Sequence, residues 1–334
     1  MNMNFYKRVL GTVVIPLVFL SVLLFICQIN GRVMIANQVS FTNFVIYAAI
    51  IMITTIALSI NLNSGRFDFS LGSIAVLSSV ISSKISYALL GQSAASAFIM
   101  FILSMVIGGL LGFISGRLYN FLRIPPIITS LGVTLIYEGI TYTITSGKYL
   151  MAEVQTASMS AFISNWVNIA VIVLVVLAVI IYIFNLSKFG AEYRALKNGQ
   201  KVAVNTGIKE VPNAIWCYVI CGILMGIVGF LNAGRNMTIN GGALNFGSIS
   251  IMFTAFLPMF IGGFIGRYSN EYIGYLLAGI CMSLLNSTFA VFANEITASM
   301  QSIINALLLV VFLIYLNNEG KIVNLFTFRW LRRN

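Results

Sequence analysis

Asp68, Glu138 and Lys84 stand within or next to long apolar runs, which makes them the chain's candidates for chemistry inside a membrane. A charged group in such a place is costly and is usually paired or functional. Arg66 is close enough to Asp68 to form an ion pair, and Asp68 equally suits a cap on a helix that begins near Ser70. Lys84 is expected to extend its ammonium group to the membrane surface.

Glu138 is followed by two helical turns rich in hydroxyl groups, contributed by Thr141, Tyr142, Thr143 and Thr145. This face of the predicted helix is expected to line a water-containing pathway. Whether Asp68 and Glu138 contact a solute or only support the fold stays open at this point.

Several classes of site are excluded or disfavoured by the residues that the chain lacks. With no histidine, it cannot form a histidine-based catalytic triad or a histidine-ligated metal centre. The four cysteines all lie in apolar runs, which favours packing over a disulfide or zinc site. No Gly-x-x-x-x-Gly-Lys-Ser/Thr loop is present to bind a nucleotide. The chain is therefore not expected to be an enzyme or to hold a cofactor or metal of its own.

Composition indicates which elements must position these residues. Apolar residues make up 59% of the 334 and charged residues 8%, against about 25% charged in soluble domains. An apolar run of about 20 residues crosses the bilayer as a helix. The sequence predicts an all-α polytopic membrane protein with one domain over 1–334. About ten spans are expected, at 10–29, 41–60, 73–90, 97–119, 127–146, 165–185, 214–234, 249–266, 272–293 and 299–317.

The distribution of lysine and arginine predicts the orientation. With the N-terminus inside and ten alternating spans, 15 of the 19 basic residues fall in inside segments and only Arg32, Lys148 and Arg235 fall in outside loops. An excess of Lys and Arg on the cytoplasmic side is the usual rule. Both termini are therefore expected in the cytoplasm. This asymmetry also accounts for the net charge of +11 without nucleic-acid binding.

Two polar breaks interrupt the hydrophobic pattern, at 63–74 and 240–249. With a two-residue gap, both read Asn, any residue, Gly, any residue, a bulky apolar residue, Asp or Asn, Phe, and then Gly-Ser-Ile. They lie 175 to 177 residues and five spans apart, so the two halves would cross the membrane in opposite directions. Such inverted repeats with interrupted helices indicate a central transport pathway; the alternative is chance similarity. The predicted pathway residues are Asn63, Asp68, Phe69, Ser70, Glu138, Tyr142, Asn240, Asn245 and Phe246.

One inside segment is long and polar, at 186–213. Asn198-Gly199 and Thr206-Gly207 are turn signals that divide it into two short helices. A pair of helices on the membrane surface would suit docking to a cytoplasmic partner. An ordinary solvated loop is the alternative.

Together these segments resemble ABC importer permeases of the ribose-type family, which also has branched-chain amino acid and nucleoside members. Residues 65–73, Gly-Arg-Phe-Asp-Phe-Ser-Leu-Gly-Ser, resemble the family's Gly-Gly-Ile-Asp-Leu-Ser-Val-Gly-Ser signature. Residues 124–132, Ile-Pro-Pro-Ile-Ile-Thr-Ser-Leu-Gly, resemble its Val-Pro-Pro-Phe-Ile-Val-Thr-Leu-Gly stretch. The third match is the segment that contacts the ATPase in this family, here Gly190, Arg194, Ala195, Asn198, Gly207 and Ile208.

The resemblance implies a type II ABC importer-like bundle in the bacterial cytoplasmic membrane. Two permease subunits, alike or unlike, would enclose one pathway, with a cytoplasmic ATP-binding subunit and an extracytoplasmic solute-binding protein as partners. ATP and magnesium would bind the partner, and loop 186–213 would transmit its motion. The implied function is import of a monosaccharide or similar small polar solute by alternating access.

Departures from the family pattern leave the solute open. Arg66 replaces the second glycine of the signature, and Glu138-Gly139 stands where the family often has Arg-Gly. A nucleoside or a branched-chain amino acid is an alternative solute. A stand-alone, ion-coupled transporter is a further alternative, although three embedded ionisable groups are few for a proton relay.

Overall fold

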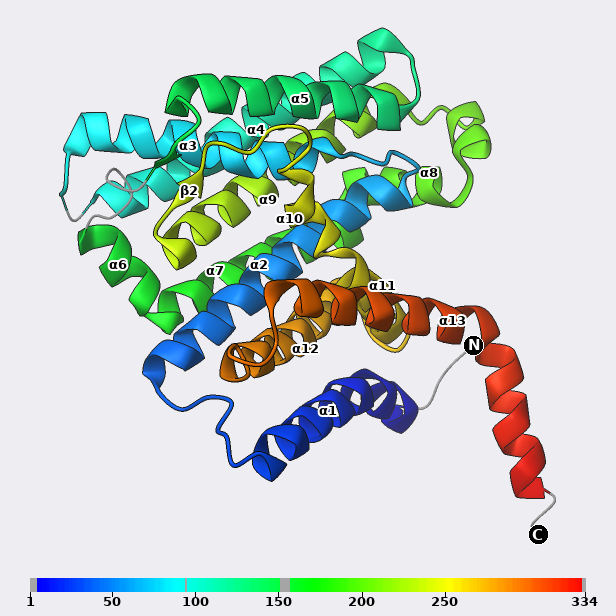
Figure 1. Cartoon of the computed structure of the whole chain (residues 1–334). Helices are drawn as coiled ribbons and strands as arrows, with labels where there is room; N and C mark the ends of the chain where they lie inside the picture. Colours follow the sequence, from blue (N-terminus) through cyan, green and yellow to red (C-terminus); the bar gives the residue numbers. More distant parts are fainter. Residues whose placement is uncertain (1–4, 94, 151–156, 332–334) are drawn as a thin grey trace.

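The computed structural model describes residues 5–93, 95–150 and 157–331, which are mostly helical. The helices form a bundle whose members run back and forth in similar directions (Figure 1). The elements are α1 (Phe5–Ile29), α2 (Gln38–Asn63), α3 (Ser70–Leu90), α4 (Ser96–Leu122), α5 (Pro126–Thr145), β1 (Tyr149–Leu150), α6 (Ala157–Ser164), α7 (Trp166–Ile181), η1 (Tyr182–Leu186), α8 (Lys188–Asn205), α9 (Glu210–Asn236), β2 (Ile239–Asn240), α10 (Ile249–Phe253), α11 (Phe256–Gly266), α12 (Glu271–Val291) and α13 (Ala298–Leu331).

Ten stretches of the described chain are long and apolar enough to cross a membrane, and each overlaps one of the ten expected ranges. The predicted all-α polytopic fold is confirmed. The eighth stretch differs from a continuous helix because it is divided into α10 and α11. Pro258 has no backbone N–H to donate to the Thr254 carbonyl, so one helical hydrogen bond cannot form at this break.

The helices α2 and α9 form the centre of the bundle, and most of their side chains are buried. The helix α4 approaches α9 closely enough that their backbones touch. A Cβ atom on Gly112 would lie 2.3 Å from the Tyr218 carbonyl oxygen, and one on Gly226 would lie 2.1 Å from that of Ser104. Small residues permit such close packing between membrane helices. By contrast, α13 lies at the edge and exposes large apolar side chains such as Ile303 and Leu307.

The polar segment expected as two short helices does fold in this way. The helix α8 is divided at Gly199, whose φ of −179° and ψ of 81° are not helical. Gly207, with φ of +94°, then forms the turn into α9. The two turn signals in the sequence therefore correspond to the interruption of α8 at Gly199 and the turn at Gly207.

The bundle has two distinct ends in Figure 1. The start of α1, the helix α8 and the end of α13 lie at the same end, called the α8 end below. The opposite end, called the far end, carries α6. There the antiparallel pair β1–β2 joins Tyr149 to Asn240 and Leu150 to Ile239, which ties the end of α5 to the end of α9.

Candidate functional site

The two polar breaks of the sequence lie side by side; most of the first is buried, whereas most of the second is exposed on the single chain. The carbonyl oxygen of Ser248, just before α10, lies against Gly72 in the first turn of α3. A Cβ atom on Gly72 would be 2.0 Å from that oxygen, so only glycine fits there. The breaks are thus neighbours in space as well as similar in sequence. The inverted repeat itself stays a prediction.

Glu138 joins the second of these breaks to α5. Its carboxylate accepts hydrogen bonds from the backbone N–H groups of Phe246 (2.9 Å) and Ser248 (2.8 Å) and from the Ser248 hydroxyl (2.5 Å). Glu138 is only 2% exposed. At 1.5 Å per residue it lies about 18 Å along α5 from Pro126, well inside the bundle. The carboxylate therefore holds the irregular segment before α10 at membrane depth.

Asp68 acts as the cap that was one of its two expected roles. Its carboxylate accepts the backbone N–H (2.9 Å) and the hydroxyl (2.6 Å) of Ser70 at the beginning of α3. The Asn61 amide donates a third, longer bond of 3.3 Å. The ion pair that the structure gives Arg66 is with Glu210, at 3.5 Å, rather than with Asp68. Of the two roles open to Asp68, the ion pair with Arg66 is therefore wrong, because Glu210, the first residue of α9, provides the carboxylate that pairs with Arg66.

Four phenylalanine rings pack together where the α2–α3 connection meets the α10–α11 break. Phe67 contacts Phe69 edge to face, with centroids 4.6 Å apart, and stacks on Phe256 at 5.9 Å. Phe253 lies 6.3 Å from Phe69 and 5.5 Å from Phe256. We call these residues the Phe cluster. Phe69, one of the predicted pathway residues, thus makes apolar contacts between the α2–α3 connection and the α10–α11 break.

A cavity of about 560 Å³ lies on the other side of Phe253 and Phe256. Aromatic rings and polar side chains share its lining. The lining residues are Tyr47, Ser250, Phe253, Thr254, Phe256, Leu257, Met282, Ser302, Asn305, Ala306 and Leu309. The buried Oδ1 atom of Asn305 has no hydrogen-bond partner among the described residues. We call this space the central cavity.

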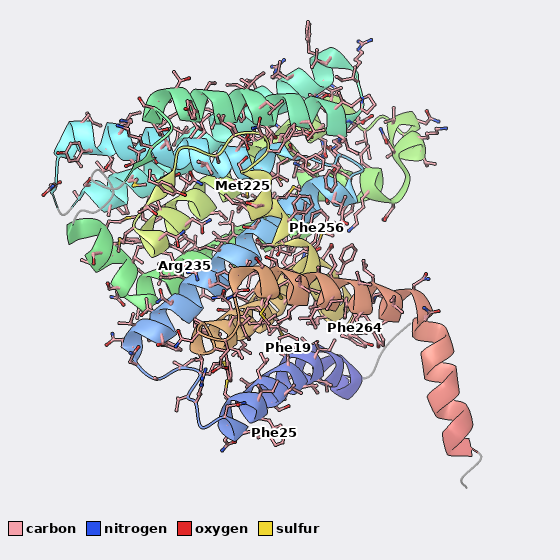
Figure 2. The ribbon with its side chains drawn as sticks, in the orientation of Figure 1. Phe19, Phe25, Met225, Arg235, Phe256 and Phe264 are labelled. Atoms are coloured by element: carbon pink, nitrogen blue, oxygen red, sulfur yellow. The ribbon has the colours of Figure 1, made fainter. Side chains whose placement is uncertain are left out.

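A second cavity, of about 430 Å³, opens at the far end and is more polar. It lies among the start of α2, the end of α9 and the end of α12. Its lining consists of Val33, Met34, Ala36, Ser40, Asn43, Phe44, Arg235, Asn236, Asn286, Ser287, Ala290 and Val291. We call it the far-end cavity. The guanidinium of Arg235 lies 4.6 Å from the centroid of the Tyr47 ring, so these two side chains connect the linings of both cavities. Figure 2 labels Arg235 toward the far end of the bundle.

The remaining predicted pathway residues do not converge on one point. Asn63 lies at the α8 end, where it donates to Glu271. Asn240 lies at the far end, where its side-chain oxygen accepts a hydrogen bond from the Gly242 N–H. Tyr142 is 42% exposed and Phe246 is 39% exposed, on the surface of the single chain. Asn245 is also exposed. The predicted set therefore spans the bundle from end to end rather than forming one pocket.

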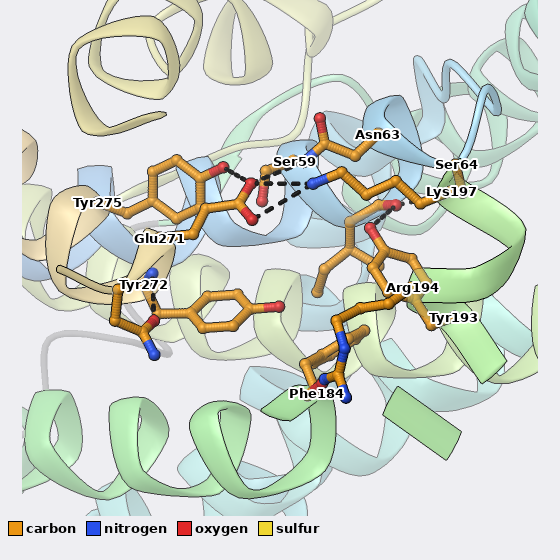
Figure 3. Close-up of polar contacts among 12 residues, drawn as sticks. Ser59, Asn63, Ser64, Phe184, Tyr193, Arg194, Lys197, Glu271, Tyr272 and Tyr275 are labelled. Carbon is orange, nitrogen blue, oxygen red and sulfur yellow. Dashed lines mark hydrogen bonds and ion pairs between the residues drawn. The ribbon is translucent and has the colours of Figure 1, made fainter. Parts of the chain in front are cut away.

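Glu271, the first residue of α12, accepts hydrogen bonds from three side chains, one on α2, one on α8 and one on α12 itself. Asn63 donates to it from the end of α2 (2.9 Å), Tyr275 from the next turn (2.6 Å) and Lys197 from α8 (3.3 Å). Figure 3 shows the carboxylate between these groups. Glu271 thereby links α8 to the end of α2.

Glu210, the first residue of α9, makes the parallel connection. It accepts hydrogen bonds from Arg66 in the α2–α3 connection (3.5 Å) and from Gln200 in α8 (2.7 Å). Arg66 is only 3% exposed, although it carries a charge. Two carboxylates thus stand between α8 and the segment that begins the first polar break.

The residues predicted for the coupling segment lie on α8 or in the turn between α8 and α9. On the inner face, a Cβ atom on Gly190 would lie 2.2 Å from the Phe184 carbonyl oxygen, which Arg194 also contacts. Tyr193 donates to the Ile60 carbonyl at 2.9 Å, and burial raises the pKa of its phenol. Ala195 and Ile208 are half-buried, whereas Asn198 and Gly207 are exposed. α8 therefore has an anchored face and a free one.

Several residues that the structure brings together are not indicated by any sequence pattern. Glu210 and Glu271 begin helices, where acidic residues are common because of the helix dipole. Except for Gln200, their partners on α2, on α8 and in the α2–α3 connection lie between 74 and 208 residues away, too far to be inferred from a single sequence. Within residues 5–93, 95–150 and 157–331, no three Cys, Asp or Glu side chains lie close enough together to hold a metal ion.

Comparison with known proteins identifies the family. Residues 40–313 match the model of the branched-chain amino acid transport system permease component family. The autoinducer 2 import system permease protein LsrC of Photorhabdus luminescens is 26% identical over 195 residues, 56% of each chain. LsrC of Yersinia pestis (strain Pestoides F) is 25% identical over 214 residues, 60% of this chain and 58% of the relative.

The aligned region thus spans little more than half the length of these relatives, and no solved structure matches. The family match nevertheless covers most of the chain, including both polar breaks and α8. It confirms the resemblance drawn from the three motifs. The chain belongs to the branched-chain amino acid transport system permease family and is a multi-pass permease of the ABC importer type.

Proposed function

We propose that this chain is the membrane-spanning subunit of an ABC importer that carries a monosaccharide or similar small polar solute into the cytoplasm. The irregular segment between β2 and α10 carries this proposal. Glu138 holds it at membrane depth, yet Gly242, Asn245 and Phe246 are exposed on the single chain. Irregular backbone inside a membrane is tolerated only where protein or a water-filled cavity covers it. This face therefore suits a pathway shared with a second permease subunit, alike or unlike.

The solute class is supported by the two cavities. Hydroxyl and amide groups line both of them, and the central cavity adds the rings of Tyr47, Phe253 and Phe256. Binding sites for small ligands typically combine apolar walls with a few polar groups. Relatives that carry an import system permease name agree with uptake rather than export.

In this proposal, a partner subunit supplies the energy for transport by hydrolysing ATP. The exposed face of α8 is its proposed docking surface, and the α8 end is the proposed cytoplasmic side, with both chain termini. Glu210 and Glu271 connect α8 to the segment that carries the Phe cluster residues Phe67 and Phe69. Movement of α8 would thereby reach the α8-end wall of the central cavity, as alternating access requires. An extracytoplasmic solute-binding protein would deliver solute at the far end.

Reconstitution into vesicles tests this function. The chain is placed in proteoliposomes with the ATPase and binding protein encoded beside its gene, and uptake of radiolabelled monosaccharides is measured with and without ATP inside. Uptake that requires both ATP and the ATPase is expected. Uptake by the chain alone, driven by a proton or sodium gradient, would instead establish an ion-coupled transporter and refute the proposal.

A further inference from the structure

The far-end cavity contains a set of hydrogen-bonding groups without protein partners. The guanidinium of Arg235 has no hydrogen bond or ion pair within the described part of the chain, and it lies over the Tyr47 ring, 4.6 Å from the centroid. The side chains of Asn43, Asn236 and Asn286 likewise have no hydrogen bond to other described residues. These groups come from α2, α9 and α12 and line the same 430 Å³ space.

Among the residues that the structure describes, no acidic side chain compensates the charge of this cavity. Its lining includes one cation, Arg235, and no carboxylate. The nearby far-end acid, Glu295, is already paired with Arg32. A guanidinium presents five donors in a planar fork that matches a carboxylate or phosphate. The surrounding amides offer both donors and acceptors, which suit hydroxyl groups.

The position of Tyr47 gives this cavity a role in transport. One side of Tyr47 carries Arg235 at the far-end cavity, and the residue also lines the central cavity. A solute held by Arg235 would therefore stand directly before the next space along α2. A cation over an aromatic ring also keeps the guanidinium in place while its edge remains free to donate hydrogen bonds.

We propose that the far-end cavity is a binding site for a small polyhydroxylated solute that carries a carboxylate or phosphate group. Arg235 binds the anionic group, and Asn43, Asn236 and Asn286 bind the hydroxyl groups. This inference rests on the proposed import function, because the inference places the binding site at the entrance of the transport pathway. It also narrows the class of solute to acidic ones.

A binding comparison on the purified chain in lipid nanodiscs tests the site without an ATPase. The probes are glucuronate, glucose and acetate, which separate the contributions of the anionic group and of the hydroxyl groups. Dissociation constants come from the concentration dependence of the unfolding temperature, because a ligand stabilises the state that it binds. We expect glucuronate to bind at least about tenfold more tightly than either glucose or acetate, from the usual strength of charge-assisted hydrogen bonds.

Variants assign the binding to the cavity. Arg235→Gln is expected to weaken glucuronate about 10- to 100-fold while leaving glucose nearly unchanged. Arg117→Gln is the matched control, because Arg117 also lies over an aromatic ring, Phe113, at 5.1 Å, but outside this cavity. Asn286→Ala is a milder second variant and is expected to weaken glucuronate about threefold to tenfold.

Several results would overturn this assignment. They are an absence of glucuronate binding, equal binding of glucuronate and glucose or acetate, and unchanged glucuronate binding in Arg235→Gln or, if that variant does not fold, in Asn286→Ala. Competition by anionic lipids in the nanodisc would assign Arg235 to a lipid headgroup instead. These measurements need no ATP, so a failure of ATP-driven uptake would count against the proposed function and not against this site.

Discussion

Replacing Glu138 with alanine removes the acceptor of three hydrogen bonds that hold the segment before α10. Two of these bonds come from the buried Ser248, through its N–H and its hydroxyl, and one comes from the N–H of Phe246. A hydrogen bond to a charged group contributes about 1.5–3 kcal/mol, and a buried donor left without a partner costs about 1–3 kcal/mol. Because Phe246 is 39% exposed, water can replace its lost partner at little cost.

The expected loss comes mainly from the two Ser248 donors and amounts to about 3–5 kcal/mol of local stability. Glu138→Gln keeps one carbonyl oxygen for Ser248 but turns an NH₂ group toward the Phe246 N–H, so its expected loss is smaller, about 1–2 kcal/mol. The order of effect, with alanine worse than glutamine, follows from the number of acceptors that remain.

Amide hydrogen exchange on the chain in nanodiscs measures this loss where it occurs. A change of 1.4 kcal/mol is tenfold in an equilibrium constant, so Glu138→Ala should speed exchange at the Ser248 amide by about 100-fold or more. The glutamine variant should speed it by about tenfold. Glu192→Gln, on α8, is the control and should leave this amide unchanged. Wild-type exchange at Ser248 in the alanine variant would refute the role of Glu138 in holding the segment.

Two further predictions concern the close contact of the breaks and the coupling of α8. Gly72→Ala should lower thermal stability strongly, because the added Cβ would lie 2.0 Å from the Ser248 carbonyl oxygen. Gly132→Ala is the control and should be tolerated, because no atom lies within 4 Å of the added carbon. Equal stability of the two variants would contradict the packing of Gly72 against Ser248. Lys197→Ala should reduce solute uptake severalfold with little loss of ATPase binding, because it removes the cation that contacts Glu271. Lys197→Arg, which keeps a cation at this position, should transport nearly normally, and equal uptake by both variants would remove this ion pair from the coupling route.

The parts of this fold that depend on local sequence could be predicted. Each membrane span is a continuous apolar run, so hydropathy alone places it within a few residues. The division of α8 at Gly199 follows from a turn signal of two adjacent residues. The Asp68 cap on Ser70 likewise spans only two residues. In each case the residues that decide the structure are neighbours in the chain.

The parts that depend on distant contacts could not be predicted. Glu138 was identified as an embedded acid, but its partners Phe246 and Ser248 lie 108 and 110 residues away. Asp68 is a possible partner for Arg66 in the sequence, but the partner in the structure, Glu210, lies 144 residues away. A single sequence does not show which helix faces meet, so the choice among carboxylates requires the packed structure.

The distribution of open space along α2 bears on the stage of transport that this structure represents. The far-end cavity and the central cavity lie on either side of the Arg235–Tyr47 contact. Toward the α8 end, the Phe cluster packs against the central cavity, and the α2–α3 connection that carries Phe67 is held by two carboxylates bonded to α8. Under the proposed function, the Phe cluster would therefore lie between the central cavity and the cytoplasmic side of this chain, and the far-end cavity would face the outside. Opening toward the cytoplasm then requires Phe67 to leave Phe256, and the bonds to α8 are the connection through which a docked ATPase would pull it.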